Sequence, residues 1–528
     1  AKAYNYASRA SDVDTTNAEN QALVMKISNL YVKYGEKTAF VSSEILQIPE
    51  EKLTGFFEEK QELSVFRNTI KEILRGKEHT LSPEMEQLLA SAGDVTDAAD
   101  NIFSMFNNAD LTFPEITGED GEKVRLTHGR YIAFLESSDR NVRREAFQAM
   151  YSTYKSFRNT LAATYQSKLK AHLFRAKARK YSSCLEAAVN RTNVPASVYH
   201  NLIEAVHQNL DKMHRYVELR KKLLGVEELH MYDLYVPLVK EADVKVSFEE
   251  AKKNVYEALE PLGERYRSIL KEGFENRWID VYENEGKRSG AYSAGVFGVH
   301  PYVLLNHNNT LDSEFTLAHE MGHALHSYLS NTTQPHPDAS YVIFVAEVAS
   351  TCNEVLLMQH LLKKTTDKVE RAYLINHFLE SFRGTVYRQT MFAEFELLTH
   401  ELCEKGEALT PDRLSSLYYD LNKKYFGDSI VVDEDIAMEW ARIPHFYYNF
   451  YVYQYATGFS AAVAIANKIL TEGEPAVENY LKFLSSGCSK APIDLLRIAG
   501  VDMTTPEPVN AGLKMFSELL DEMEELMK

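Results

Sequence analysis

The pentapeptide His319-Glu320-Met321-Gly322-His323 constrains this chain more than any other stretch. Apolar residues surround it on both sides, so the segment is predicted to form a buried helix. Helical positions four apart lie one turn above each other, and His319 and His323 therefore face the same way. Two such imidazoles can hold one metal ion, and zinc suits them, with Zn–N bonds of about 2.0–2.1 Å. Glu320 can take the proton of a water molecule at that metal.

A catalytic zinc site needs a third protein ligand and leaves its fourth position to water. Glu347 lies in the apolar stretch 341–362, which is too long for a typical strand and is predicted to be a second buried helix. A linker with Pro335 and Pro337 separates the two helices, so they can pack antiparallel and bring Glu347 to the histidines. Glu354, on the same helix face, is either the ligand itself or a partner that orients a ligand histidine. We favour Glu347 as the ligand.

Three more polar residues belong to the first of these helices. Asp312 and Ser313 precede the apolar run and are predicted to cap its N-terminus. His326 lies one turn beyond His323 on the same face. Because three ligands are already placed and catalysis needs an open position, we expect His326 to pack or to support a ligand rather than bind the metal.

Four stretches carry a resemblance to a known family: 287–292 (Lys-Arg-Ser-Gly-Ala-Tyr), 319–326, 344–350 and 445–458. On these residues the chain resembles the oligoendopeptidase F family of zinc peptidases, relatives of thimet oligopeptidase. The resemblance implies a mainly α fold in which two helical lobes enclose a deep substrate channel. It also implies a small β-sheet beside a zincin-type helix, one zinc ion per chain at the channel floor, and Glu347 as the third ligand.

The run 445–455 is unusually aromatic. If it is helical, His445, Tyr448, Tyr451 and Tyr455 form one stripe, whose hydroxyl groups would each need a partner. In the thimet relatives a comparable histidine and tyrosines lie in a glycine-rich loop and contact the reacting carbonyl, although this chain lacks those glycines. The resemblance therefore implies that His445, Tyr455 and Tyr448 act in catalysis, and that Tyr451 contacts substrate.

The segment 282–298 is rich in glycine and is predicted to be a loop, and 299–306 is predicted to be a strand. Pro301 cannot donate to a ladder, which confines the strand to a sheet edge. An edge strand can bind an extended peptide as an extra strand, so we expect Val299 and Tyr302 to contact substrate.

We expect two domains, an N-terminal helical lobe at 1–120 and a catalytic domain at 121–528. The chain opens at Ala1 without a methionine, so we expect the lobe to be incomplete at its start. Within the lobe, Gly35 is predicted to end a helix. One long amphipathic helix is predicted from Ser138 toward Lys180.

Composition narrows the class of protein further. The formal charge of −18 argues against nucleic acid and anionic membranes as partners, and no apolar run is long enough to span a membrane. The four cysteines are scattered without a C-x-x-C pair, which favours a cytoplasmic protein. We infer no obligate protein partner, and oligopeptides are the expected substrates.

These observations favour a zinc-dependent endopeptidase that hydrolyses short unstructured oligopeptides. A zinc dipeptidyl carboxypeptidase is the alternative enzyme, and it would need a cationic clamp, for which Arg442 is the candidate. A peptide-binding helical protein with a structural metal is the alternative without catalysis. The presence of Glu320 argues against it, because a structural site has no need of a base.

Overall fold

The computed structural model describes residues 1–239 and 245–528. Helices dominate it, and the predicted mainly α class is confirmed. Its strands form three small sheets, namely β1 (Glu115–Thr117) with β2 (Lys123–Arg125), β3 (Leu229–His230) with β7 (Ile430–Val431), and β4 (Ile279–Asp280), β6 (Tyr302–Leu304) and β5 (Tyr292–Ala294). No helix in the described part of the chain combines the length and apolarity that crossing a membrane requires.

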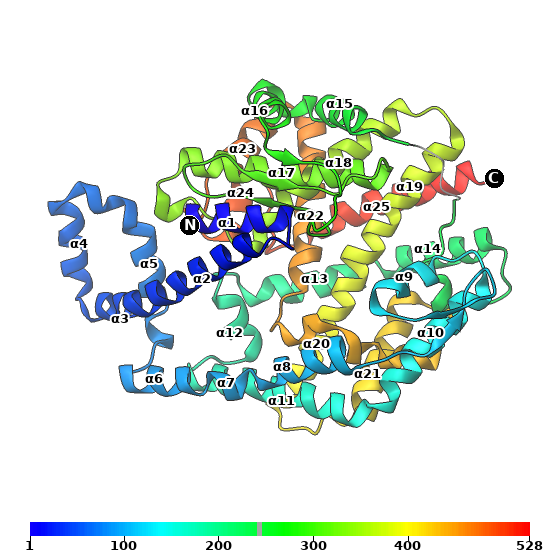
Figure 1. Ribbon diagram of the computed structural model, residues 1–528, viewed down its shortest axis with the longest axis horizontal. Helices are drawn as coiled ribbons and strands as arrows, with labels where there is room; N and C mark the ends of the chain where they lie inside the picture. Colours follow the sequence, from blue (N-terminus) through cyan, green and yellow to red (C-terminus); the bar gives the residue numbers. More distant parts are fainter. Residues whose placement is uncertain (240–244) are drawn as a thin grey trace.

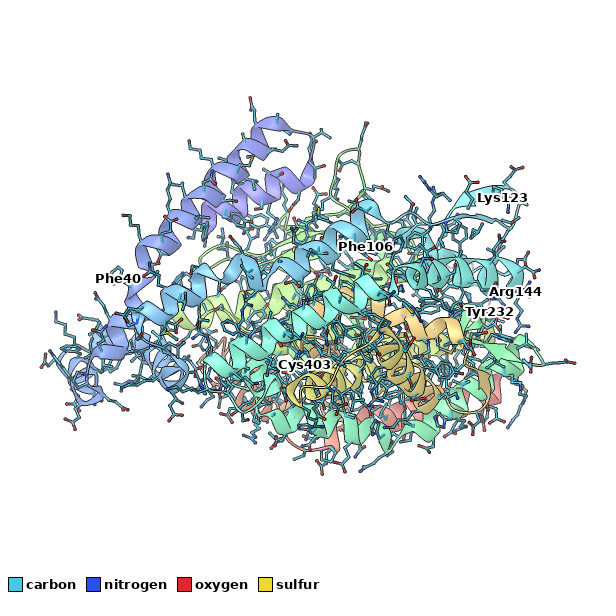
Figure 2. The ribbon with its side chains drawn as sticks, turned by 90° about the horizontal axis from the view of Figure 1, so that it is seen from below. Phe40, Phe106, Lys123, Arg144, Tyr232 and Cys403 are labelled. Atoms are coloured by element: carbon cyan, nitrogen blue, oxygen red, sulfur yellow. The ribbon has the colours of Figure 1, made fainter. Side chains whose placement is uncertain are left out.

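The N-terminal helices are α1 (Lys2–Val13), α2 (Ala18–Thr38), α3 (Phe40–Gln47), α4 (Glu50–Glu59), η1 (Gln61–Phe66), α5 (Arg67–Arg75), η2 (Lys77–His79), α6 (Pro83–Ser91), α7 (Gly93–Thr96), α8 (Ala98–Met105) and η3 (Phe106–Asp110). They form an arm whose middle part, α2 to α5, projects from the rest of the molecule, while its two ends, α1 and α8, lie against that body (Figure 1). Figure 2 shows Phe40 near the tip of this arm and Lys123 at the opposite end of the molecule. The predicted stop at Gly35 is wrong, because α2 continues through it to Thr38. A lone glycine inside a helix costs only about 1 kcal/mol and does not by itself end the helix.

One carboxylate makes several of the contacts that join helix α1 to the segment around β5. Asp12 accepts hydrogen bonds from the Tyr292 hydroxyl at 2.8 Å, from Arg288 at 3.2 Å and from Arg9 at 2.9 Å. Burial opposes ionisation of Asp12, but these three hydrogen bonds outweigh it and hold its pKa below the usual value. The Arg288 amide also donates to the Asp12 carbonyl. The arm and the segment before β5 are therefore joined directly.

The middle of the chain is also mainly helical. They are α9 (His128–Leu135), α10 (Arg140–Ser156), α11 (Arg158–Ala178), α12 (Cys184–Asn190), α13 (Ala196–His207), α14 (Leu210–Leu224), η4 (Met231–Asp233), α15 (Phe248–Ala258), η5 (Glu260–Leu262) and α16 (Gly263–Glu275). The single helix predicted from 138 toward 180 is wrong, since Phe157 leaves helical geometry and separates α10 from α11. The two helices pack against different neighbours, α10 on α9 and α11 on α8 and α20, and this tertiary packing requires the break.

The C-terminal half contains the buried helices of the core. They are α17 (Leu311–Thr333), η6 (His336–Asp338), α18 (Ile343–Lys364), α19 (Lys368–Phe382), η7 (Arg383–Tyr387), α20 (Arg388–Glu404), α21 (Pro411–Phe426), η8 (Glu434–Arg442), η9 (Pro444–Tyr447), α22 (Tyr453–Glu472), α23 (Glu474–Leu484), α24 (Pro492–Ile498) and α25 (Glu507–Leu526). In Figure 1, α17 and α18 lie in the upper part with α15 and α16, α20 and α21 lie in the lower part, and α22 runs between them. The two buried helices predicted at 313–327 and 341–362 are confirmed as α17 and α18.

Helix α17 begins at Leu311, at least two residues earlier than predicted. Thr310, not Asp312 or Ser313, is the N-cap residue, and its hydroxyl accepts a hydrogen bond from the Ser313 amide at 3.2 Å. Ser313 instead lies in the first turn and donates its hydroxyl to Asn308. The helix start is thus satisfied by a side chain, as buried helix ends require.

Helices α17 and α18 are in close backbone contact at Gly322. A Cβ atom added there would lie 2.6 Å from the Ser350 Cα and 2.7 Å from the Ala349 carbonyl oxygen. A buried amide holds the same pair together, because Asn353 donates to the Ala318 carbonyl at 3.1 Å and accepts from the Tyr266 hydroxyl at 2.9 Å. The spacing of the two helices therefore depends on the absence of a side chain at Gly322.

The predicted edge strand is wrong in its position. Strand β6 is the central strand, parallel to β4 and antiparallel to β5, and β5 occupies the edge beside α17. Pro301 precedes β6, so its missing amide hydrogen is not needed, while the Val303 amide donates to the Trp278 carbonyl at 2.7 Å. The edge strand β5 lies within 282–298, the segment that composition predicted to be a loop. The sequence does not reveal it, because three residues are too few to show the alternation of a strand.

We predict that Gly322→Ala separates α17 from α18, since the added methyl group meets backbone atoms that cannot rotate away. The free energy of unfolding should fall by about 1–3 kcal/mol, and metal binding should weaken with it. Thermal unfolding and titration with zinc measure both effects. Gly55→Ala is the control, because nothing lies within 4 Å of a Cβ atom at that helical position. Equal behaviour of the two variants would contradict the role of this contact.

Candidate metal centre

Three side chains converge where α17 meets α18. His319 Nε2 lies 3.2 Å from His323 Nε2 and 3.4 Å from Glu347 Oε2, and the third side of this triangle measures 3.5 Å. A tetrahedral ion with bonds of about 2.1 Å keeps its ligand atoms about 3.4 Å apart, so the triangle fits one face of such an ion. Within the described residues no other group of histidine, cysteine and acidic side chains is gathered in this way.

Glu354 has the role of an orienting partner. Its Oε1 lies 2.5 Å from His319 Nδ1, so the imidazole donates Nδ1–H to the carboxylate and leaves the Nε2 lone pair facing the triangle. Glu354 thus meets the side of the imidazole that faces away from the triangle, which supports its interpretation as an orienting partner. Ser350 similarly supports Glu347, donating its hydroxyl to Oε2 at 3.3 Å.

The charges around the triangle favour a cation. Burial lowers the pKa of His319, but the hydrogen bond to Glu354 and the surrounding carboxylates raise it more, to about 9. Burial raises the pKa of Glu347, yet His323 and His319 outweigh it and hold that pKa below the usual value. Without metal the site thus holds a proton on an imidazole, and a bound metal ion would replace that proton.

Glu320 is a buried base beside the triangle. Only 6% of the residue is exposed, and its Oε2 atom has no hydrogen-bond partner within residues 1–239 and 245–528. Burial raises the pKa of Glu320, although the neighbouring His319 and His323 work in the opposite direction. The side chains of His319 and Glu347 remain about a third exposed, at 29% and 30%, so solvent reaches the triangle from one side.

His326 belongs to the core and not to the metal. Its ring stacks on Tyr341 with centroids 3.7 Å apart, and only 1% of the residue is exposed. Burial lowers its pKa to about 3, so the ring is neutral. The sequence left two roles for His326, packing or support of a ligand. The contacts of its ring fit packing.

The aromatic run is not one continuous helix. Residues 444–447 form η9, and Asn449 and Phe450 take left-handed backbone conformations with φ of +55° and +58° before α22 begins at Tyr453. These two residues turn the chain, which no helical pattern can show. The side chains separate as a result: Phe446, Tyr447 and Phe450 are buried, while Tyr448 is 53% exposed.

The turn nevertheless gathers the predicted group around His445. Its ring lies 5.5 Å from Tyr448, 6.1 Å from Tyr451 and 5.8 Å from Tyr455, measured between centroids. The Tyr455 hydroxyl lies 3.4 Å from His445 Nε2. We call His445, Tyr448, Tyr451 and Tyr455 the phenol cluster.

Helix α22 places the phenol cluster next to the metal ligands. At Gly458 an added Cβ atom would lie 3.5 Å from the Glu347 Cβ, and Tyr455 lies one turn earlier on the same face of α22. Burial raises the pKa of Tyr455, and the charges of Tyr451 and Glu347 add to the shift, so its hydroxyl remains a donor.

Two predicted substrate contacts lie farther along the sheet. Val299 is 38% exposed and falls in the connection between β5 and β6, and Tyr302 begins β6 opposite Ala294. Sequence reasoning missed β5 as the edge strand. A signal was available, because the family-like segment 287–292 ends at Tyr292, the first residue of β5.

A histidine pair on one helix, a carboxylate from the next and a buried glutamate base define a metal-dependent hydrolase. The chain belongs to peptidase family M3, whose model matches residues 133–515, while a model described as Oligopeptidase F matches residues 44–113. It is a metalloendopeptidase.

Relatives and solved structures agree with this membership. Over 524 residues the chain is 54% identical to oligopeptidase PepF of Bacillus subtilis, a match that covers 99% of this chain and 78% of that protein. It is 44% identical to an oligoendopeptidase F homolog of Lactococcus lactis, covering 100% and 88%. Its fold matches the crystal structure of oligoendopeptidase-F from Enterococcus faecium with a TM-score of 0.80 and 44% identity, covering 99% and 90%.

We predict that Glu354→Gln weakens zinc binding by about 10–100-fold, because the amide lacks the charge that orients and polarises His319. In the unaltered protein, zinc affinity should rise about tenfold per pH unit from pH 6 to 8, since one proton with a pKa near 9 must leave. Competition with a chromophoric chelator measures both. Glu401→Gln is the control, since that carboxylate lies on α20 and pairs with Lys405, just beyond the end of the helix. Unchanged affinity in Glu354→Gln would contradict the orienting role.

Proposed function

We propose that this chain is a zinc-dependent endopeptidase that hydrolyses internal peptide bonds of short unstructured oligopeptides. The observation that carries the proposal is the triangle of His319, His323 and Glu347, whose sides of 3.2 to 3.5 Å match one tetrahedral ion. A bound zinc ion would polarise the scissile carbonyl and lower the pKa of water toward about 7.

The remaining chemistry belongs to side chains of this chain. Glu320 takes a proton from the attacking water and delivers it to the leaving amine, a task for which a buried carboxylate of raised pKa is suited. His445 and Tyr455 donate hydrogen bonds to the oxyanion that develops at the carbonyl carbon. Tyr448 is the next candidate for this task, and Tyr451 holds the substrate.

The edge strand supplies a place for an extended peptide. Strand β5 lies at the edge of its sheet and beside α17, so a substrate can add to it as a further strand. Val299 and Tyr302 would contact the substrate at the far end of this hairpin. We propose that residues 1–120 form a lobe that roofs the site and closes a channel, which would exclude folded proteins and favour short unstructured peptides.

A zinc dipeptidyl carboxypeptidase is weakened as an alternative by the state of its proposed clamp. Arg442 lies 3.7 Å from the Glu439 carboxylate and stacks over Tyr131 at 5.0 Å. A guanidinium held in this way is already paired and cannot easily receive a substrate carboxylate. Four free thiols in the described chain support the cytoplasm as the proposed location.

The test of the function uses a fluorogenic peptide blocked at both ends, which only an endopeptidase can cleave. We expect cleavage with zinc bound, loss of cleavage after chelation, and recovery when zinc is restored. Glu320→Gln should retain zinc and the fold but lose cleavage, because it removes the base and leaves the ligands intact. A stable folded protein should resist the enzyme. Turnover above a few per cent in Glu320→Gln would show that another group takes the proton.

Tyr455→Phe tests the proposed oxyanion contact. If the hydroxyl binds only the charge that develops in the transition state, kcat should fall by roughly 10²–10³ while KM stays similar. Steady-state kinetics on the blocked peptide measure both constants. Tyr328→Phe is a suitable control, because that ring packs on Trp278 away from the phenol cluster. A raised KM with unchanged kcat would assign Tyr455 to substrate binding instead.

A further inference from the structure

The turn that forms the phenol cluster is conformationally unfavourable. Asn449 and Phe450 are consecutive residues with positive φ, and a bulky side chain such as that of Phe450 rarely adopts this conformation. Such backbone persists only where the surrounding structure determines it. Something outside the turn must therefore hold Phe450 in place.

A buried carboxyl group on α20 makes that contact. The Phe450 amide donates a hydrogen bond to Glu396 Oε1 at 2.6 Å, and 0% of Glu396 and 3% of Phe450 are exposed. The Phe450 ring lies against His400, with centroids 4.3 Å apart, and against Tyr199 at 5.4 Å. The backbone and the side chain of Phe450 are thus anchored to the same wall of the core.

Glu396 has no other evident use for its carboxyl group. Its Oε2 atom is buried without a hydrogen-bond partner among the residues that the structure describes, and Oε1 accepts the hydrogen bond from the Phe450 amide. Burying a carboxyl group costs free energy unless hydrogen bonds compensate it. An apolar residue would satisfy the core better at this position, and what an apolar residue cannot supply is the acceptor for Phe450.

The neighbouring histidines make the anchor rigid. His400 Nδ1 lies 2.8 Å from the Glu396 carbonyl oxygen and must donate to it, which leaves His400 Nε2 to accept from His172 Nδ1 at 3.0 Å. Both rings are neutral, since burial lowers the pKa of each. The surface on which the Phe450 ring rests is therefore fixed by hydrogen bonds.

We propose that Glu396 is a positioning residue of the reaction, which acts through the Phe450 amide to hold the turn that brings Tyr451 and Tyr455 back to His445. The proposal rests on the function proposed above. It explains how a chain without glycines in this turn keeps an arrangement for which glycine would be the usual choice. Among the described residues the Glu396 carboxyl group makes no hydrogen bond or ion pair to a metal ligand, and its effect is on where the donors of the phenol cluster lie.

The protonation state of the Glu396 carboxyl group determines which variants are informative. Burial raises the pKa of Glu396 to about 8, although the Phe450 amide works against that shift. Near neutral pH glutamine therefore reproduces the shape, the charge and the acceptor, whereas leucine fills the same space without an acceptor. Glu394→Gln is the matched control, because that carboxylate lies two residues earlier on α20 and binds His207, Lys424 and Tyr425 instead of the turn.

The experiment compares these variants as zinc-loaded enzymes on the blocked peptide. We expect Glu396→Leu to lower kcat by about 10–100-fold with zinc content unchanged, because displaced oxyanion donors weaken the transition state. KM should rise by a smaller factor, because Tyr451 is displaced with the same turn. Glu396→Gln should stay within about threefold of the unaltered kcat. Glu394→Gln should keep its kcat even where its melting temperature falls. A folded, zinc-loaded Glu396→Leu with the unaltered kcat overturns the proposal.

Two further measurements keep the test decisive. Amide hydrogen exchange over 445–455 should be faster in Glu396→Leu than in Glu396→Gln, and equal over α17, and this readout does not depend on activity. If the unaltered protein cleaves nothing, the proposed function fails, while the exchange result still decides the role of Glu396. If Glu396→Leu does not fold, Glu396→Asp withdraws the carboxyl group by one methylene and should lower kcat by about three- to tenfold. An unaltered kcat in Glu396→Asp overturns the proposal.

Discussion

The contact between α17 and α18 at Gly322 is the constraint on which the metal centre depends. Two histidines on one helix can face the same way without any help from the rest of the chain, but the third ligand comes from a different helix. Its distance is set by how closely two backbones approach, and here they approach to the limit that a glycine permits. The Asn353 amide, bonded to the Ala318 carbonyl, holds the pair at that limit from within. The ligand triangle is thus a result of backbone packing as much as of side-chain chemistry.

Close packing of helix α22 on α18 likewise positions the rest of the site. It packs against α18 through small residues, and at Gly458 it lies close to the carbon chain of Glu347. Tyr455 is carried to the metal ligands by this packing. The turn before α22 then places His445 and Tyr451 beside Tyr455. Each part of the site is positioned by a buried contact outside the reacting groups.

Sequence reasoning recovered what depends on local periodicity. The spacing of His319 and His323 predicts a shared ligand position, and the long apolar run around Glu347 predicts the second helix, because both follow from helical geometry alone. Whether Glu354 or Glu347 meets the metal depends on how two helices pack, so the alternatives remained open until the contact with His319 Nδ1 was seen. The placement of His445 and Tyr455 came from family resemblance rather than from the physics of the residues.

The failures have a common cause in contacts between distant parts of the chain. Strand order decides which strand lies at an edge, and no property of Pro301 reports that β4 pairs with β6. Phe450 takes a left-handed conformation because Glu396, 54 residues away, accepts its amide, and propensity would place it elsewhere. At Phe157 the neighbours of two helices, not its own preferences, require a break. Local sequence patterns therefore predict individual helices well, but they do not predict which distant segments pack against one another.

The carboxylate of Asp12 links the projecting arm to the edge strand, and this has a thermodynamic consequence. The same group binds Tyr292 on β5 and Arg9 on α1, so neither element can shift without changing the contacts of the other. A peptide that bound along β5 would then change the free energy of the contacts that hold the arm in place. By reciprocity, an arm held in one position would alter peptide affinity by the same factor. The proposed substrate site on β5 would thus be coupled to helix α1 through Asp12.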